Sequence, residues 1–444
     1  MTEVADVKAE MGDETAAGAA AAGPRSVGGL LRKAEIDLRL VGMVLALIAI
    51  LIGFTIATNG RILQPVNLVN LSVQMVSIAV IATGMTMVIA SRNIDLSVGS
   101  IAGLVALVSV VMMVRVLPGV IGLGHPLMWV SALLIGLAVG ALLGSMQGYL
   151  IAYIGIPSFV VTLGGLLAFR GLTWVISRGS TVAPVDATFR LLGGGPRGSV
   201  GATASWILGI LASAAIIALL LNNRRQRRRF GFPLRPVWAE VTIGTLAVGA
   251  VLGIVWVFNK YFWPEALARR YAEENGIPIP EGGLHIAAGI PWPVIVLVGV
   301  TIAMTFIATR TRFGRYVFAY GGNPEAAELS GIKTKWTIMK TFMLIGILCA
   351  ISGSIAAARL DGATLDLGIG YELYVIAACV IGGTSFSGGV GTIPGAVLGA
   401  LVLSSLSYGL NFMGVESPIQ DIVAGIVLVV AVGFDTYSRR RQAR

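Results

Sequence analysis

The chain has 444 residues, of which 56% are hydrophobic and only 12% are charged. Because a water-soluble domain carries about a quarter charged residues, this composition excludes a set of soluble domains and indicates a polytopic membrane protein. The net charge of +10 does not indicate nucleic-acid binding, since the basic residues cluster in short loops between apolar runs.

Residues 1–37 are rich in alanine and glycine, with acidic residues near the start and no early apolar core. They are typical of a disordered cytoplasmic tail and not of a cleaved signal peptide. The tail is followed by apolar segments long enough to cross about 30 Å of hydrocarbon. Twelve such segments are expected, at roughly 38–58, 66–90, 96–117, 127–154, 157–178, 203–221, 237–258, 287–308, 338–360, 370–386, 390–411 and 418–435. The predicted fold class is an all-α membrane protein with about twelve transmembrane helices.

Basic residues next to the spans predict the orientation. The first span is preceded by Arg25, Arg32, Lys33 and Arg39, and the last is followed by Arg439, Arg440, Arg441 and Arg444. Since lysine and arginine gather on the cytoplasmic side, both termini are expected in the cytoplasm, which requires an even number of spans. The same count places the arginine-rich loop 222–236 inside, together with the basic loop 309–340, and the loop 259–286 outside.

A short helix is predicted within the basic loop 309–340. The segment Pro324 to Leu329 has Asn323 as its N-cap, Pro324 at the first helical position and Gly331 as a stop signal. A capped helix held on the cytoplasmic face indicates docking to another protein.

An internal repeat relates residues 88–103 (VIASRNIDLSVGSIAG) to residues 380–395 (VIGGTSFSGGVGTIPG). Duplication of this kind is common in transporters, where the substrate route runs between related halves; chance similarity of glycine-rich segments is the alternative. The glycine run from 382 to 395 indicates either irregular backbone at membrane depth or close helix packing.

Polar residues in apolar spans are the default candidates for a translocation pathway. Asn70, Gln74 and Ser77 recur at helical spacing and form one polar stripe, which suits a neutral, polyhydroxylated solute. Asp95 and Ser97 stand between the second and third spans, where Asp95 could equally cap a helix.

Three charged residues near spans can be explained by structural roles instead of a role in transport. Arg170 either snorkels to the outer interface or pairs with a buried acid. Glu372 and Asp421 stand in first helical turns, where acids complement the helix dipole.

Enzymatic and metal-binding motifs are absent from the sequence. Without a P-loop or an HExxH motif, the chain is predicted not to be an enzyme, and the energy for transport must come from another chain. The two cysteines, Cys349 and Cys379, lie within predicted spans, and the two histidines, His125 and His285, are far apart. Neither a metal site nor a bound cofactor is expected.

Four motifs resemble the permeases of bacterial ABC-type monosaccharide importers, the family of the ribose, arabinose, galactose and xylose systems. They are NIDLSVGS (93–100), GIPSFVVTLG (155–164), AYGGNPEAAELSGI (319–332) and YELYVIAACVIGGTSFSGGVGTIPGAVLGA (371–400). The resemblance implies a multi-pass protein of the inner membrane that works by alternating access. It also implies three partners, namely a cytoplasmic ATPase subunit, a second permease copy and a periplasmic sugar-binding protein.

The resemblance further assigns residues 309–337 as the segment that couples the permease to the ATPase. Its contact residues are expected to be Asn323, Pro324, Glu325, Ala326, Ala327, Leu329 and Gly331.

The permease domain is expected to span 38–437, before a basic tail at 438–444. Residues 180–286 look like a helical hairpin inserted into a ten-helix core, a longer form most similar to the xylose permeases. D-xylose is therefore the predicted substrate, with ribose or another monosaccharide as alternatives. A departure from the family pattern occurs at Ser91–Arg92–Asn93, where two glycines usually precede Ile94. Two other classes stay open, a secondary sugar transporter and a membrane scaffold.

Overall fold

The computed structural model describes residues 38–280 and 283–442, so the predicted tail 1–37 lies outside the described residues, as do the last two residues of the tail 438–444. The chain divides into two compact units. The smaller contains residues 207–254 with residues 38–42 of the described part, and the larger contains 43–206 and 255–442. The regular secondary structure of the described residues is helical, with four isolated bridges and no strand, which confirms the all-α fold class.

Ten helical segments in the described ranges are long and apolar enough to cross a membrane. They are formed by α3 (Leu38–Ala57), α4 (Pro65–Ala90), α5 (Val98–Val111) with its continuation to Ile121, α7 (Met128–Tyr149) with its continuation to Ile154, α8 (Ser158–Ser177), α10 (Ala202–Arg229), α11 (Val237–Asn259), α13 (Trp292–Arg310), α16 (Thr334–Arg359) and α18 (Ile393–Phe412). The continuations are η2 (Met112–Val116) with α6 (Leu117–Ile121), and η3 (Leu150–Ile154).

The two remaining expected spans coincide with helices that have shorter apolar stretches. These are α17 (Tyr371–Ile381) and the first part of α19 (Ser417–Gln442), which is apolar from Ser417 to Val427. The other short helices are η1 (Arg61–Leu63), α9 (Ala187–Arg190), η4 (Leu191–Gly193), α12 (Glu265–Asn275), α14 (Arg312–Gly322) and α15 (Pro324–Leu329). Every expected span therefore falls on a helix, and ten of them have the length and composition of a span.

The core of the larger unit is built around α4 and α16. In their most apolar windows, 89% and 78% of the residues are buried, against 6% in α3. Glycines bring the neighbouring helices close, because a Cβ at Gly144 would lie 2.1 Å from the Phe342 carbonyl oxygen. Small residues at such crossings are what hold helices together where lipid is as apolar as the side chains.

The two copies of the repeat occupy matching places in the fold. Each contains the end of one helix, a loop and the start of the next, namely α4 to α5 and α17 to α18. The two loops touch, since Gly389 donates its backbone N–H to the Ala90 carbonyl over 2.9 Å. The second loop combines both expected properties of its glycine run. Gly383, Gly388 and Gly389 have positive φ angles, and a Cβ at Gly395 would clash with the Gly382 carbonyl oxygen.

Candidate functional site

The helix α15 has the capping pattern expected from its sequence. The Asn323 side chain accepts a hydrogen bond from the Ala326 N–H over 3.0 Å, and Pro324 opens the helix. At the other end Gly331 adopts a φ of +77°, while Ile332 donates its N–H to the Ala327 carbonyl. This closing geometry satisfies carbonyls that the end of a helix would otherwise leave without donors. The prediction of a short, defined helix is confirmed.

One face of α15 packs on the protein and the other is open. Ala327 is 4% exposed, whereas Leu329 is 90% exposed, the highest value of any large apolar side chain described. Glu325 and Ala326 are exposed as well. The Glu328 carboxylate accepts a hydrogen bond from the Thr334 hydroxyl over 2.9 Å and ties α15 to the start of α16. The open face of this capped helix thus carries a projecting leucine and an exposed acid.

The end of α14 joins α15 to the two repeat loops. Arg92 donates from Nε to the Gly321 carbonyl over 2.6 Å and from a terminal nitrogen to the Gly322 carbonyl over 2.8 Å. Gly321 lies so close to Ala90 and Gly389 that a Cβ there would clash with both backbones. We call this contact the α14 joint, formed by Gly321, Gly322, Ala90, Arg92 and Gly389. The α14 joint thus connects the segment that leads into α15 with the loops between core helices.

Tyr320, which precedes the α14 joint, lies near Arg92 and Glu328. Burial raises the pKa of its hydroxyl above the ordinary value, and the Glu328 charge raises it further. The side chain therefore stays neutral at physiological pH, and the charges near the joint come from Arg92 and Glu328.

The polar stripe on α4 runs from exposed to buried. Asn70 is exposed, Gln74 is half-buried and Ser77 is 7% exposed. At its inner end, the Ser352 hydroxyl of α16 donates to the Ser77 carbonyl over 2.8 Å. The helical spacing therefore does place the three side chains along one face of α4, with exposure falling from Asn70 to Ser77.

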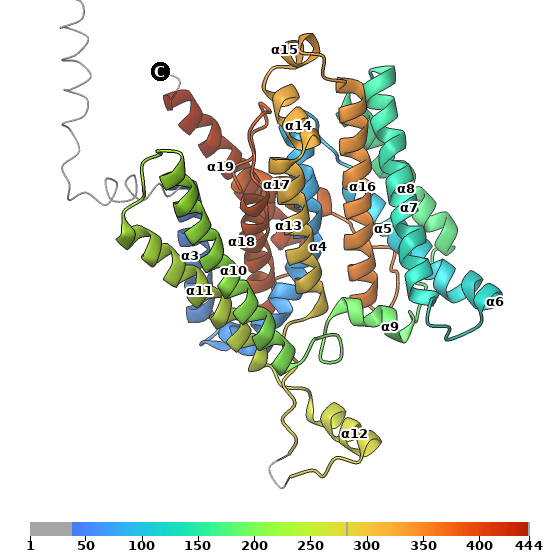
Figure 1. Cartoon of the computed structure of the whole chain (residues 1–444). Helices are drawn as coiled ribbons and strands as arrows, with labels where there is room; N and C mark the ends of the chain where they lie inside the picture. The colour runs from blue at the N-terminus through green and yellow to red at the C-terminus, as the bar shows by residue number, and fades with distance from the viewer. Residues whose placement is uncertain (1–37, 281–282, 443–444) are drawn as a thin grey trace, which may run out of the picture. The chain divides into compact units, whose positions relative to one another are not determined.

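A polar cavity of about 760 Å³ opens beside the exposed end of this stripe. Asn70 and Val73 of α4 line it, with Arg359 at the end of α16 and Tyr261 and Arg270 from the segment around α12. The cavity thus lies at the α12 end of the larger unit, opposite to α15 (Figure 1). Its mixture of amide, guanidinium and phenol groups can bind hydroxyl groups of a small solute.

Three residues beside the cavity were missed by sequence reasoning. Arg359 lies close enough to Tyr371 and Tyr408 for their charges to interact, and the Tyr408 hydroxyl lies 3.3 Å from the Asn67 amide oxygen. These residues come from α16, α17, α18 and α4. The only sequence signal was an arginine at the end of an apolar span, which is also typical of a snorkelling residue.

Asp95 and Ser97 lie away from the cavity, in a fully buried cluster. The Asp95 carboxylate accepts hydrogen bonds from the Ser97 N–H and hydroxyl over 2.8 and 2.6 Å. Ser97 also pairs with the Gln147 side chain of α7. Asp95 thus fixes the turn before α5, but it does not itself cap that helix, whose N-cap position is Ser97.

Glu372 and Arg170 also lie close to each other in the larger unit. The Arg170 charge acts on Glu372, but no ion pair joins the two side chains in the described part of the chain, so the alternatives for Arg170 both stay open. Glu372 is 9% exposed, and one of its oxygens has no hydrogen-bond partner among the described residues, as is the case for Asp95.

Comparison with known proteins agrees with this architecture. Residues 67–432 match a family described as the permease component of the branched-chain amino acid transport system. The xylose transport system permease of Escherichia coli K12 is 37% identical over 414 residues, which cover 93% of this chain and 96% of the relative. The ribose import permease of the same strain is 30% identical over 394 residues, covering 88% and 92%. The galactose/methyl galactoside permease of Haemophilus influenzae is 28% identical over 423 residues, covering 93% and 99%. No solved structure matches the chain significantly.

The chain therefore belongs to this family of ABC transporter permeases. It is a multi-pass membrane subunit and not an enzyme, and the ATPase activity sits on a separate subunit. The family also implies a periplasmic binding protein as partner. The family description and the full-length relatives name different solutes, amino acids and sugars. The match to the family therefore settles the architecture, and the solute requires its own argument.

Proposed function

We propose that the chain is the translocating subunit of an importer that carries a monosaccharide, best D-xylose, across the bacterial inner membrane. Two copies would pair with two ATPase subunits, fed by the periplasmic binding protein. The observation that carries the proposal is the 37% identity along nearly the whole length of a xylose permease, supported by 34% to a second one from Haemophilus influenzae. The amide, phenol and guanidinium groups that line the cavity around Asn70 can bind sugar hydroxyls, and they suit a sugar better than a hydrophobic amino acid.

Uptake in a strain that lacks its own pentose permeases tests the solute. The chain is expressed with its ATPase and binding protein, and labelled D-xylose, D-ribose, D-galactose and leucine are compared. We expect D-xylose to accumulate fastest. Faster uptake of ribose would move the assignment to another sugar, and uptake of leucine alone would contradict a sugar importer.

For the membrane arrangement, we propose twelve spans with both termini in the cytoplasm. This count includes α17 and the apolar part of α19, and the even number agrees with the basic tails on both sides. It puts α15 on the cytoplasmic side and α12 outside, which is supported by their positions at opposite ends of the larger unit (Figure 1).

Cysteine labelling is expected to report this arrangement. Both native cysteines are buried, so Ser330→Cys beside α15 and Glu273→Cys in α12 introduce exposed thiols. A membrane-impermeant maleimide should label Glu273→Cys in intact spheroplasts and Ser330→Cys only in inside-out vesicles. Labelling of both from one side would refute the orientation.

For the solute route, we propose that the sugar enters through the cavity at Asn70 and passes along the α4 stripe. Gln74→Leu keeps the volume of the side chain but removes its hydrogen-bonding groups. We expect sugar uptake to fall about tenfold, because one lost hydrogen bond in such a site costs about 1–2 kcal/mol. Uptake at a range of sugar concentrations measures the change.

Gln226→Leu provides the matched control for this variant. Gln226 is exposed in α10 of the smaller unit, so the same substitution there should leave uptake unchanged. If Gln74→Leu transports at the normal rate, the residue does not belong to the route.

One observation favours a second candidate, a secondary transporter. Asp95 and Glu372 are buried acids with unpartnered oxygens, and ion-coupled carriers use such groups. Proteoliposomes separate the two mechanisms. The proposed importer needs ATP, the ATPase and the binding protein, whereas a secondary transporter would accumulate sugar in response to a proton gradient with the permease alone.

A further inference from the structure

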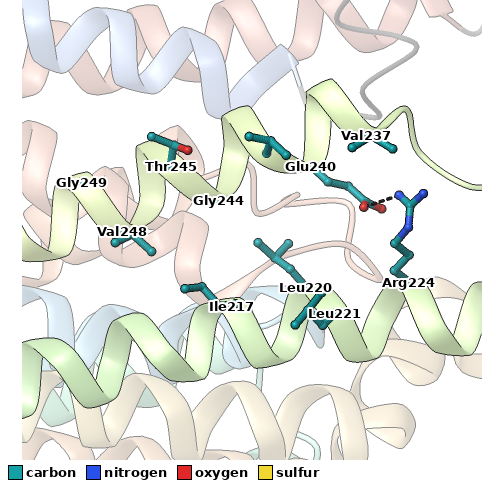
Figure 2. Close-up of a pocket in the computed structure, with 11 residues that line it drawn as sticks. Ile217, Leu220, Leu221, Arg224, Val237, Glu240, Gly244, Thr245, Val248 and Gly249 are labelled. Atoms are coloured by element: carbon teal, nitrogen blue, oxygen red, sulfur yellow. Dashed lines mark hydrogen bonds and ion pairs between the residues drawn. The ribbon is translucent and has the colours of Figure 1, made fainter.

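The hairpin of α10 and α11 encloses an open apolar groove. Ile217, Leu220 and Leu221 of α10 face Val248 and other residues of α11 around a volume of about 670 Å³ (Figure 2). Two glycines, Gly244 and Gly249, set back the wall on the α11 side. At Gly249 an added Cβ would meet nothing within 4 Å, so the groove is not closed by packing inside the hairpin.

One end of the groove is strongly basic. The ion pair of Arg224 and Glu240 closes it, as Figure 2 shows, and Arg224 also donates to the Arg235 carbonyl. Three further arginines in the same turn, Arg225, Arg228 and Arg229, are exposed. Between residues 222 and 240 the chain contains six arginines and a single acid. The groove therefore ends in a positive field that its own acid does not neutralise.

Exposed aromatic side chains surround the same end. Phe230 is 68% exposed, Phe232 63% and Trp238 50%. Aromatic rings next to arginines at the end of apolar helices are typical of the level of the lipid headgroups. The arginines and aromatic side chains at this end of the groove thus suit the level of the lipid headgroups. The apolar part of the groove would then extend toward the hydrocarbon.

We propose that this groove binds an anionic phospholipid, with an acyl chain between α10 and α11 and the phosphate at the exposed Arg225, Arg228 and Arg229. The apolar walls do not suit a sugar, and a zwitterionic lipid would leave the positive charge uncompensated. The inference goes beyond sugar import and does not depend on which solute is carried.

Photo-crosslinking in nanodiscs tests the proposal on the full-length permease. Nanodiscs contain either a photoactivatable phosphatidylglycerol or the matching phosphatidylcholine, and labelled peptides are identified by mass spectrometry. We expect phosphatidylglycerol to label residues 217–249 at least about tenfold more than phosphatidylcholine, since each basic residue near the surface strengthens binding several-fold. Equal labelling by the two lipids would overturn the proposal.

Two sets of variants separate the groove from its charged end. Gly249→Leu fills the groove, and Gly253→Leu, in equally open surroundings on the same helix, is its control. The triple change R225Q/R228Q/R229Q removes exposed charge, and Arg269→Gln in α12 is its control.

The first variant of each set should lower the phosphatidylglycerol label about tenfold, and the controls should leave it unchanged. Both glycine replacements favour the helix, so loss of folding does not mimic the effect. An unchanged label in Gly249→Leu would overturn the proposal, as would crosslinks that show a second permease copy in the groove.

Discussion

Leu329→Asp is expected to reduce ATP-driven sugar uptake more than tenfold while the permease still inserts and folds. Leu329 is 90% exposed, so the change costs little stability. A projecting apolar side chain on a rigid helix is a typical interface anchor, and loss of an anchor costs about 2 kcal/mol or more of binding. Uptake, stimulated ATP hydrolysis and copurification of the ATPase should all decline together.

Leu123→Asp is the matched control, because Leu123 is 87% exposed in the loop between α6 and α7. It should transport normally. Glu325→Lys changes the same surface but also affects the stability of α15. The acid at the helix N-terminus contributes about 0.3–1 kcal/mol, which the lysine would lose. Normal uptake in Leu329→Asp would remove α15 as the docking site.

Gly321→Ala is expected to destabilise the permease by about 3 kcal/mol or more. The added Cβ would lie 1.7 Å from the Ala90 carbonyl oxygen and 2.7 Å from the Gly389 nitrogen. Both neighbours are backbone atoms, so no flexible side chain can move aside. A lower melting temperature in detergent and a loss of uptake are the expected results.

Gly322→Ala controls for the change in helix propensity. Gly322 also belongs to the last turn of α14, but a Cβ there meets nothing within 4 Å. This variant should melt and transport like the wild-type protein. Equal behaviour of the two variants would mean that α14 is not packed against the repeat loops as described.

The helix α15 was predictable because its signals are local. Asn323, Pro324 and Gly331 lie within nine residues, and each acts on the backbone of its own turn. The spans were predictable for a similar reason, since about twenty apolar residues in a row have few stable alternatives to a helix in the membrane. The α4 stripe follows directly from the helical period.

The joint and the cavity depend on contacts between distant parts of the chain. Gly321 is separated from Ala90 by more than two hundred residues, and nothing near it in sequence requires a glycine. Arg359, Tyr371 and Tyr408 come together only when α16, α17 and α18 pack. Asp95 was correctly singled out as a junction residue, but whether it would face a cavity or a turn depended on Gln147 of α7.

Arg92 shows how a departure from the family pattern can be understood in the fold. Its φ of +60° is in the left-handed region, which glycine adopts freely and arginine does at a cost of about 1–2 kcal/mol. The two hydrogen bonds to α14 offset this cost, because bonds from a charged donor contribute about 1.5–3 kcal/mol each.

The α14 joint also limits how this permease could be rewired to a foreign ATPase. If α15 alone were replaced by the helix of a relative, the new helix would be attached to the α14 joint of this chain, whose residues pack against the original segment. We expect a working chimaera to require exchange of residues 319–332 together with 90–92 and 388–389, because the Arg92 side chain and the close glycine backbones join these three segments. The segments to be exchanged thus lie far apart in the sequence, although they meet in the fold.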